Sequence, residues 1–138
     1  MLKKITLSLA LTLLSATAAL AANYIEPQEL KGLLDNEQPV ILVDIQPAAD
    51  FEKQHLIGSI ETNAFPAVKD EEKARLDSAL AVINASKYPV IVVCPRGKSG
   101  AMNSYNYFES KGVSEERMQI LEGGIAGWPY KELFVEGR

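Results

Sequence analysis

The fold is decided by the stretch Val90-Ile91-Val92-Val93-Cys94-Pro95-Arg96-Gly97-Lys98-Ser99-Gly100. Its first four residues are apolar and β-prone, which is typical of a strand buried on both faces of a parallel sheet. A short polar loop with two glycines follows this strand. Beyond the loop, Ala101, Tyr105 and Phe108 recur with a helical period up to Gly112, a residue type that commonly ends helices. The stretch therefore predicts a buried strand, a tight turn and a helix in succession.

The same alternation extends along the chain in both directions. Further strand-like apolar runs lie at residues 40–43, 57–60 and 118–121. Further helical patterns lie at residues 27–34, 48–54 and 70–85, the last with Leu76, Leu80 and Ile83 on one face. Strands that alternate with helices predict an α/β fold, with a central, mostly parallel sheet and helices on both faces. Ligands of such sheets bind beyond the carboxyl ends of the strands, which is where Cys94 lies.

Length and composition fit one globular domain. The chain has 138 residues, of which 47% are hydrophobic and 23% charged, and these values are ordinary for a domain with a core of its own. The formal net charge is −4, and Lys and Arg form no continuous stripe. Nucleic acids and anionic membrane surfaces are therefore not expected as partners. We expect a monomer.

The N-terminal segment has the pattern of a secretory signal peptide. Lys3 and Lys4 precede an uncharged run over residues 5–22, whose second half consists mainly of small residues. Ala19-Leu20-Ala21 matches the A-x-A cleavage pattern, which predicts a signal peptide over residues 1–21 and a mature domain over residues 22–138. The protein is then expected in the periplasm, free of the membrane after cleavage. The alternative is an uncleaved anchor, because the uncharged run is about long enough to span a bilayer.

Cys94 is the only cysteine of the chain, so an intrachain disulfide is impossible. A lone thiol is either buried and inert or present to react, and the surrounding loop favours reaction. Gly97 and Gly100 allow backbone angles that other residues avoid, so the loop can curl until its N–H groups converge on Cys94. Together with the N-terminus of the following helix, such N–H groups stabilise a thiolate. Arg96 and Lys98 attract an anionic substrate, unless the cysteine only packs and both cations are merely solvated.

Other uses of a cysteine need residues that this chain lacks. A protein-phosphatase or arsenate-reductase loop needs Arg six residues after the cysteine, where Gly100 stands. A thioredoxin-like motif needs a second cysteine in place of Gly97. A cysteine protease needs a histidine base, and the only histidine, His55, is interpreted as a packed, hydrogen-bonded residue. The chain has no group of Cys and His residues for a metal site, and no cofactor is expected.

Several other polar or aromatic residues are assigned structural roles. Asp44 ends a predicted strand, where a carboxylate can accept hydrogen bonds from backbone N–H groups. This capping role is favoured over a role in acid catalysis. The aromatic residues Trp128, Tyr105 and Tyr107 are assigned to the core rather than to a binding surface.

Three ordered motifs resemble those of the rhodanese family over nearly all of residues 22–138. The amino-terminal one comprises Leu42-Val43-Asp44-Ile45, Asp50-Phe51 and His55-Leu56-Ile57-Gly58-Ser59-Ile60. The middle one is the loop at Cys94, with Gly97 and Ser99. The carboxy-terminal one reads Leu121-Glu122-Gly123-Gly124-Ile125-Ala126-Gly127-Trp128. Three motifs in order with suitable spacing are far more specific than any one of them.

The resemblance implies a rhodanese-like fold and a sulfurtransferase that carries sulfane sulfur as a persulfide on the catalytic Cys94. The donor would be a small anion such as thiosulfate or polysulfide. The acceptor would be a thiol or a cyanide-like nucleophile, and a partner protein could supply it. The residues expected to bind the substrate are Pro95, Arg96, Gly97, Lys98, Ser99 and Gly100. The residues expected to serve as structural motifs are Asp44, His55, Gly123, Gly124 and Trp128.

The chain departs from the family pattern at two positions. Gln46 stands where many members have Arg, which predicts that a buried charge pair near Asp44 is missing. Ser99 stands where Arg is frequent, which leaves the identity of the donor open. The alternative to an enzyme is a non-catalytic rhodanese-like module that carries sulfur or docks proteins, and a turnover assay separates the two.

Overall fold

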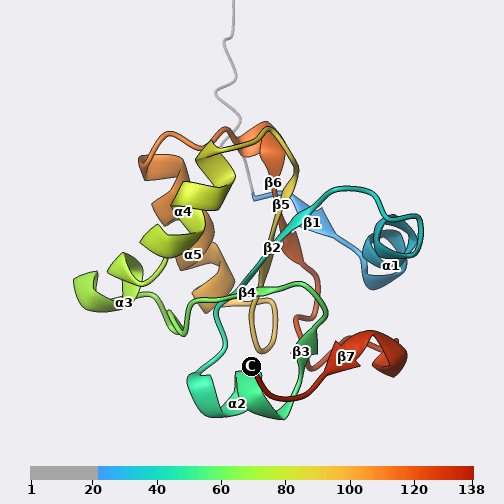
Figure 1. Ribbon diagram of the computed structural model, residues 1–138. Helices are drawn as coiled ribbons and strands as arrows, with labels where there is room; N and C mark the ends of the chain where they lie inside the picture. Colours follow the sequence, from blue (N-terminus) through green and yellow to red (C-terminus); the bar gives the residue numbers. More distant parts are fainter. Residues whose placement is uncertain (1–21) are drawn as a thin grey trace, which may run out of the picture.

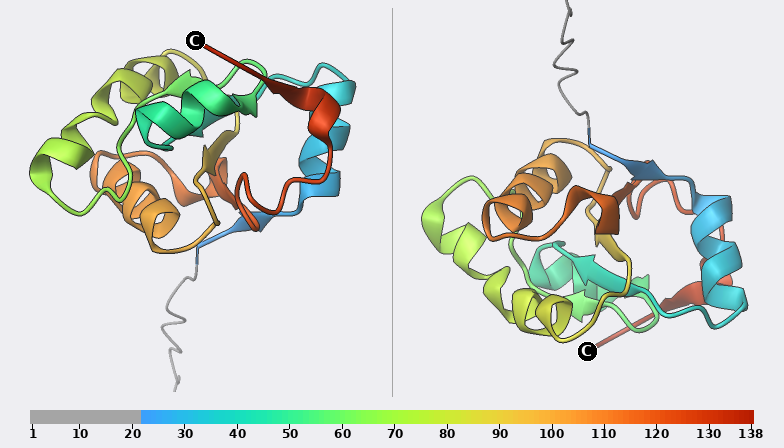
Figure 2. Two further views of the ribbon diagram at one scale, coloured as in Figure 1. Left: turned by 90° about the horizontal axis from the view of Figure 1, so that it is seen from below. Right: turned by 90° about the horizontal axis from the view of Figure 1, so that it is seen from above.

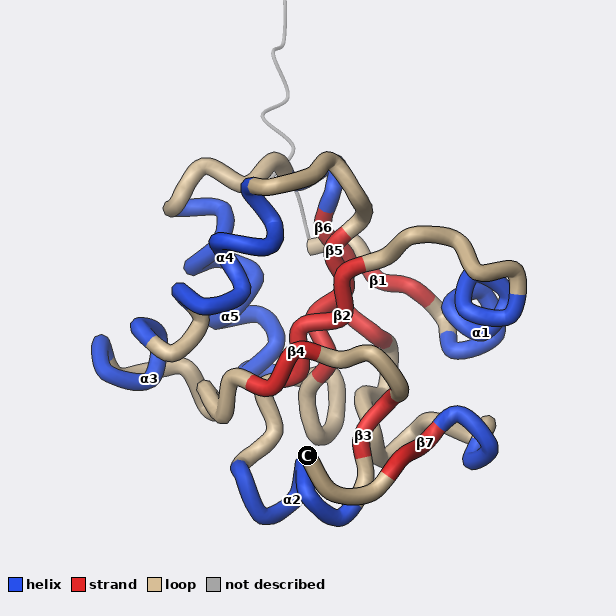
Figure 3. The backbone as a smooth tube through the Cα atoms, in the orientation of Figure 1, coloured by secondary structure: helices blue, strands red, loops and turns tan. Residues whose placement is uncertain are grey.

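The computed structural model describes residues 22–138 and contains one five-stranded sheet whose neighbouring strands are all parallel (Figure 1). In space the strands follow the order β1 (Tyr24–Ile25), β6 (Met118–Leu121), β5 (Val90–Val93), β2 (Ile41–Asp44) and β4 (Ile60–Glu61). The tube in Figure 3 shows these strands side by side in the middle of the molecule. The predicted α/β class is confirmed.

Helices cover both faces of the sheet, as expected (Figure 2). One face carries α3 (Asp70–Ala74), α4 (Asp77–Asn84) and α5 (Ser99–Ser110). The other carries α1 (Pro27–Asp35) and the C-terminal segment. The short helix α2 (Ala48–Lys53) follows β2 and lies beyond the carboxyl ends of the strands. Two 3₁₀ turns complete the helical structure, at Glu115–Arg117 and Lys131–Leu133.

Side chains of β5 alternate between two hydrophobic cores, because successive residues of a strand point to opposite faces. Val90 and Val92 belong to the core under α4 and α5, which we call the first core. Ile91 and Val93 belong to the second core, on the side of α1. Cys94 continues the alternation and lies with the first core. The periodicity of the strand thus decides on which side of the sheet the thiol emerges.

The register of β2 and β5 sets what lies next to that thiol. Asp44 pairs with Val93, so both strands end at the same level of the sheet. Ile45 continues the ladder by donating its backbone N–H to the carbonyl of Val93 at 2.9 Å. The residues that follow each strand, including Cys94, therefore meet at one edge, as the carboxyl-end rule predicts.

The strand predicted over residues 57–60 is wrong. The chain instead forms β3 (His55–Leu56), a turn with Gly58 at a φ of 82°, and then β4. Only β4 joins the main sheet, whereas β3 pairs antiparallel with β7 (Phe134–Val135). The C-terminal segment supplies the hydrogen-bond partners of β3, and no pattern in the sequence near β3 indicates this pairing.

The single helix predicted over residues 70–85 is broken at Arg75. Backbone N–H groups of Arg75 and Leu76 donate three residues back, to Glu72 and Lys73, which tightens the chain into a turn between α3 and α4. Leu76 and Ile83 are fully buried and Leu80 is partly buried, so the predicted apolar face is correct.

The predicted signal peptide, residues 1–21, lies outside the described residues. Within residues 22–138, every helix is too short or too polar to cross a bilayer.

Candidate functional site

The loop from Cys94 to Gly100 joins the end of β5 to the start of α5 and curls as the glycine positions predict. Gly97 adopts a φ of 71°, in the left-handed region that favours glycine. In this conformation the N–H of Gly97 donates to the Sγ atom of Cys94 at 2.7 Å. The loop therefore directs a backbone dipole at the sulfur, where it stabilises negative charge.

The carboxy-terminal motif, residues 121–128, contacts this loop through backbone hydrogen bonds. The N–H of Ile125 donates to the carbonyl of Cys94, and the N–H of Ala126 donates to the carbonyl of Pro95, both at 2.9 Å. These bonds use the carbonyl oxygens of Cys94 and Pro95. The backbone N–H groups of Lys98, Ser99 and Gly100 find no backbone partner among the described residues, as expected for the first turn of a helix.

Gly124 makes the contact between the two motifs possible. A Cβ atom at this position would lie 2.2 Å from the carbonyl oxygen of Cys94 and 2.7 Å from the nitrogen atoms of Arg96 and Gly97. Gly124 also has a φ of 58°. The structural role predicted for Gly123 and Gly124 therefore has a physical cause, since no other residue type fits against the loop at Gly124.

A cavity of about 350 Å³ opens beside Cys94, and we call it the Cys94 cavity. Most of the predicted substrate-binding residues line it: Cys94, Pro95, Arg96, Lys98, Ser99 and Gly100. Gly97 does not line the cavity, because its N–H turns to the sulfur and its Cα packs against Gly123 and Gly124. The thiol itself is only 1% exposed, so it is reached through this cavity.

Three residues that line the Cys94 cavity were not predicted as site residues from the sequence. Pro47 and Asp50 come from the start of α2, and Phe65 comes from the loop after β4. The ring of Phe65 lies over Gly100, where a Cβ atom would meet it at 2.8 Å. Phe65 is 38% exposed, so part of its ring is accessible to solvent. Asp50 belongs to the amino-terminal motif, but no pattern placed it, Pro47 or Phe65 at the site, because only the folded chain brings them to the thiol.

Asp44 is fully buried at the end of β2 and has a structural surrounding, as predicted. Its Oδ1 accepts the backbone N–H of Gln46 at 2.8 Å, and its Oδ2 accepts the side-chain amide of Gln46 at 2.9 Å. Burial raises the pKa of this carboxyl to about 6, although both hydrogen bonds from Gln46 act in the opposite direction. An amide thus stands where an arginine would form the charge pair.

His55 and Trp128 are both buried and have hydrogen-bond partners. The imidazole of His55 stacks on Phe51 with ring centroids 3.7 Å apart, and its Nδ1 lies 2.9 Å from the carbonyl oxygen of Phe51. Trp128 is buried, and its Nε1 donates to the carbonyl of Tyr130 at 2.8 Å. Tyr105 is buried as predicted, whereas Tyr107 is only partly so.

The arrangement suits nucleophilic chemistry by a thiolate that needs no partner base. Arg96 and Lys98 bring positive charge to the cavity wall beside the sulfur. No group of His, Cys, Asp or Glu side chains within residues 22–138 is placed to hold a metal ion. The fold and the site together define a class: parallel α/β domains with one cysteine in the loop between a central strand and a helix.

Comparison with known proteins gives the family. The model of the rhodanese-like domain matches residues 26–131, and the chain therefore belongs to the rhodanese-like domain family. The adenylyltransferase and sulfurtransferase MOCS3 of Aedes aegypti is 29% identical over 106 residues, which cover 75% of this chain and 23% of that protein. The chain thus spans less than a quarter of the length of this relative.

Several solved structures share the fold. The thiosulfate sulfurtransferase from Pseudomonas aeruginosa has a TM-score of 0.65 at 17% identity, over 85% of this chain and 21% of that one. The As-Sb reductase from Leishmania major has a TM-score of 0.66 at 20% identity, over 84% and 86% of the two chains. Ygr203w, a yeast protein tyrosine phosphatase of the rhodanese family, has a TM-score of 0.65 at 16% identity, over 88% and 96%.

Proposed function

We propose that this protein is a sulfurtransferase that carries sulfane sulfur on Cys94. The observation that supports this most directly is the N–H of Gly97, 2.7 Å from the Sγ atom, in a loop that lines a cavity with two cations. Backbone dipoles that stabilise a thiolate equally stabilise the negative charge of a persulfide. The relationship to MOCS3, a protein described as a sulfurtransferase, supports the same chemistry.

The proposed reaction has two balanced half-reactions. In loading, the thiolate of Cys94 attacks the outer sulfur of thiosulfate, the sulfur–sulfur bond of the donor breaks, and sulfite leaves with the electron pair. Cys94 then carries a persulfide anion. In unloading, a thiolate attacks the outer sulfur of the persulfide, and the electron pair of the breaking bond returns to Sγ.

The donor is proposed to be a small anion, because Arg96 and Lys98 line the cavity in which Cys94 is a wall residue. A phosphoryl donor is less suited, because Gly100 stands where an arginine would hold the oxyanion. We also propose that the protein works in the periplasm after removal of residues 1–21, on the basis of the pattern around Lys3, Lys4 and Ala21.

Intact-mass spectrometry tests the proposal. Purified protein is incubated with thiosulfate or with polysulfide, and the mass is expected to rise by one sulfur atom and to fall again after cyanide is added. The Cys94→Ser variant is expected to gain nothing. Repeated turnover would distinguish an enzyme from a module that only carries sulfur, and failure of both donors to load Cys94 would refute the proposal.

A further inference from the structure

A second hollow of about 440 Å³ lies next to the Cys94 cavity and shares Asp50, Pro95 and Arg96 with it. Its other walls are Gln46, Lys53, Gln54, Ile125 and Ala126, and we call it the Gln46 groove. We propose that the Gln46 groove binds the sulfur acceptor, and that this acceptor is a small thiol with both an ammonium and a carboxylate group, as in a cysteine-containing peptide. This inference rests on the proposed function.

The groove is fixed in position relative to the nucleophile. Ile125 and Ala126, which line it, are the residues whose N–H groups hold the carbonyls of Cys94 and Pro95. The wall of the groove is therefore bonded directly to the loop that carries the thiol. A molecule bound in the groove is held beside the persulfide, which lowers the entropic cost of bringing a second substrate to it.

Gln46 offers the groove a hydrogen-bond acceptor. The side chain is only 3% exposed, and both N–H bonds of its amide are used, one by Asp44 at 2.9 Å and one by the carbonyl of Gln54 at 3.1 Å. These two acceptors determine the orientation of the amide. Its oxygen, Oε1, has no hydrogen-bond donor among the described residues. An amide oxygen that has no donor and belongs to a residue on the wall of a groove is suited to an N–H donor of a ligand.

Side chains of both charges line the same groove. Lys53 is exposed to 77% at its side chain, and its Nζ lies 3.9 Å from Asp50, a contact too long to neutralise either group. Arg96 adds a second cation. The ligand that matches this wall carries an ammonium for Asp50 and the Gln46 oxygen, and a carboxylate for Lys53 and Arg96.

The residues that line the Gln46 groove disfavour binding of the anionic sulfur donor there. A dianion such as thiosulfate would meet the unpartnered amide oxygen of Gln46 in the groove, and this oxygen repels negative charge. Asp50 lines both hollows, but the Cys94 cavity also has Lys98 and the free N–H groups at the start of α5. The structure therefore separates a site for the donor from a site for the acceptor, with Arg96 between them.

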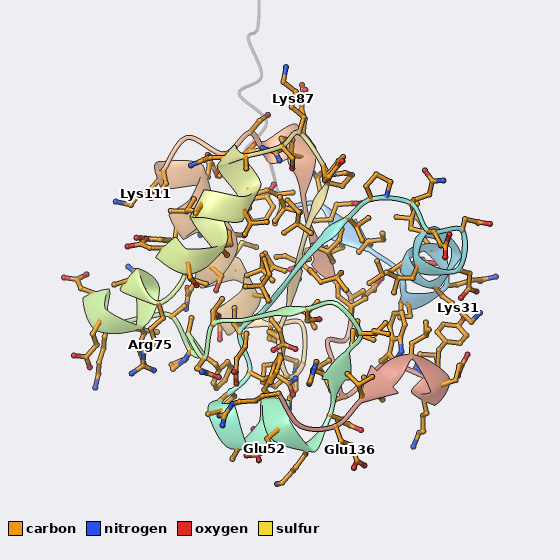
Figure 4. The ribbon with its side chains drawn as sticks, viewed as in Figure 1. Lys31, Glu52, Arg75, Lys87, Lys111 and Glu136 are labelled. Carbon is orange, nitrogen blue, oxygen red and sulfur yellow. The ribbon has the colours of Figure 1, made fainter. Side chains whose placement is uncertain are left out.

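Unloading of persulfide-loaded protein tests this separation. Cys94 is first loaded with polysulfide, and the rate of sulfur loss is measured by mass with four thiols: cysteinylglycine, 3-mercaptopropionate, cysteamine and 2-mercaptoethanol. Variant and wild-type rates are compared for each thiol separately, because their ratio cancels the intrinsic reactivity of that thiol. The variants are Lys53→Gln and Asp50→Asn, and the control is Lys87→Gln. Lys87 lies at the opposite end of the molecule from α2, as Figure 4 shows with Lys87 and Glu52 labelled.

The two variants are expected to act through different charged groups of the thiols: both should slow cysteinylglycine, whereas they should act in opposite directions on 3-mercaptopropionate. Lys53→Gln should slow unloading by the two thiols that have a carboxylate by about two- to fivefold, the range for one exposed ion pair. Asp50→Asn should slow the ammonium-bearing thiols to a similar extent and should accelerate 3-mercaptopropionate. Lys53→Gln should not change the rate with 2-mercaptoethanol, and Lys87→Gln should change no rate. Because Asp50 also lines the Cys94 cavity, each rate of Asp50→Asn is divided by its rate with 2-mercaptoethanol before the thiols are compared.

The groove and the sulfurtransferase proposal can fail separately. If Cys94 is never loaded, the proposed function is wrong. If loading is normal but both variants affect all four thiols equally, the acceptor does not use the groove. Binding provides a readout without chemistry: the unreactive thioether S-methylcysteinylglycine should shift backbone NMR signals of Lys53, Gln54 and Ala126 in the unloaded protein. Shifts confined to other residues, or no shifts at millimolar ligand, would also overturn the inference.

Discussion

Gly124→Ala probes the contact on which the whole site depends. The new methyl group would lie 2.2 Å from the carbonyl oxygen of Cys94 and 2.7 Å from the nitrogen of Gly97. Both are backbone atoms of the tight loop, so neither can be avoided by rotation of a flexible side chain. The loop must retreat by on the order of 1 Å, and a misplacement of that size can lower a catalysed rate about a hundredfold. The hydrogen bonds from Ile125 and Ala126 would be stretched by the same movement.

The expected loss in free energy of unfolding for Gly124→Ala has two parts. A residue with a side chain at a φ of 58° costs about 1–2 kcal/mol relative to glycine. Steric overlap in a packed region costs about 1–3 kcal/mol more. Gly112 is the matched control, because its φ is 91° and a Cβ atom there would meet nothing within 4 Å. Gly112→Ala should therefore lower the free energy of unfolding by the backbone part alone and should leave sulfur transfer intact.

Urea denaturation gives the free energies of unfolding, and the rate of persulfide formation with thiosulfate gives the activity. We expect Gly124→Ala to lose both more stability and far more activity than Gly112→Ala. If the two variants lose equal stability and both still load Cys94 at the normal rate, the contact between the carboxy-terminal motif and the loop does not shape the site.

The remaining predictions concern the thiol, the cations, the buried carboxyl and the N-terminus. Cys94→Ser should abolish sulfur transfer and leave the urea midpoint nearly unchanged; residual turnover would point to another nucleophile. Arg96→Ala and Lys98→Ala should lower kcat/KM for loading by thiosulfate, and salt should lower the wild-type rate, because exposed charges are screened within about 10 Å at 0.1 M. Unloading by 2-mercaptoethanol should persist in both variants, and equal losses in the two half-reactions would mean that the cations shape the loop instead. Burial raises the pKa of Asp44 from 3.8 to about 6, so the folded state holds this proton more tightly than the unfolded chain. Its contribution to stability is therefore complete below about pH 4 and is lost as the pH rises through 6, by about 3 kcal/mol at most. Unfolding curves of wild type and Asp44→Asn across this range measure it, and parallel curves would contradict the assignment. Protein recovered from its native compartment should lack residues 1–21 by intact mass, whereas a full-length mass in the membrane fraction would favour the anchor.

Sequence patterns were most informative where local chemistry and the fold agree. The bounds of β5 and β6 match the predicted strands without change, and β2 and α5 are shifted by one residue. The strands β2, β5 and β6 lie inside the sheet, with a neighbouring strand on each side. A mainly apolar run therefore marks each of them in the sequence. The loop at Cys94 was equally clear, because Gly97 is required by its positive φ.

The elements that were missed or misplaced are those with little local signal. β1 and β7 have two residues each, and they exist because β6 and β3 supply their hydrogen-bond partners from distant parts of the chain. The break at Arg75 interrupts an otherwise regular helical pattern, and only the packing of Leu76 against the first core explains it. Short segments of this kind take their conformation from their neighbours in space.

By itself, the sequence of this protein determined the central strands β2, β5 and β6, the helix after β5 and the curled loop at Cys94. Those features depend on residue periodicity and on the backbone freedom of glycine, and both are properties of neighbouring residues. Only the tertiary structure decided that Phe65 and Asp50 stand at the mouth of the Cys94 cavity and that Gly124 supports the loop. It alone also decided that Gln46 lines a second groove, with its amide nitrogen bonded to Asp44 and to the carbonyl of Gln54. These relations join residues far apart in the chain, and they arise when the parallel register brings the carboxyl ends of the strands to one edge.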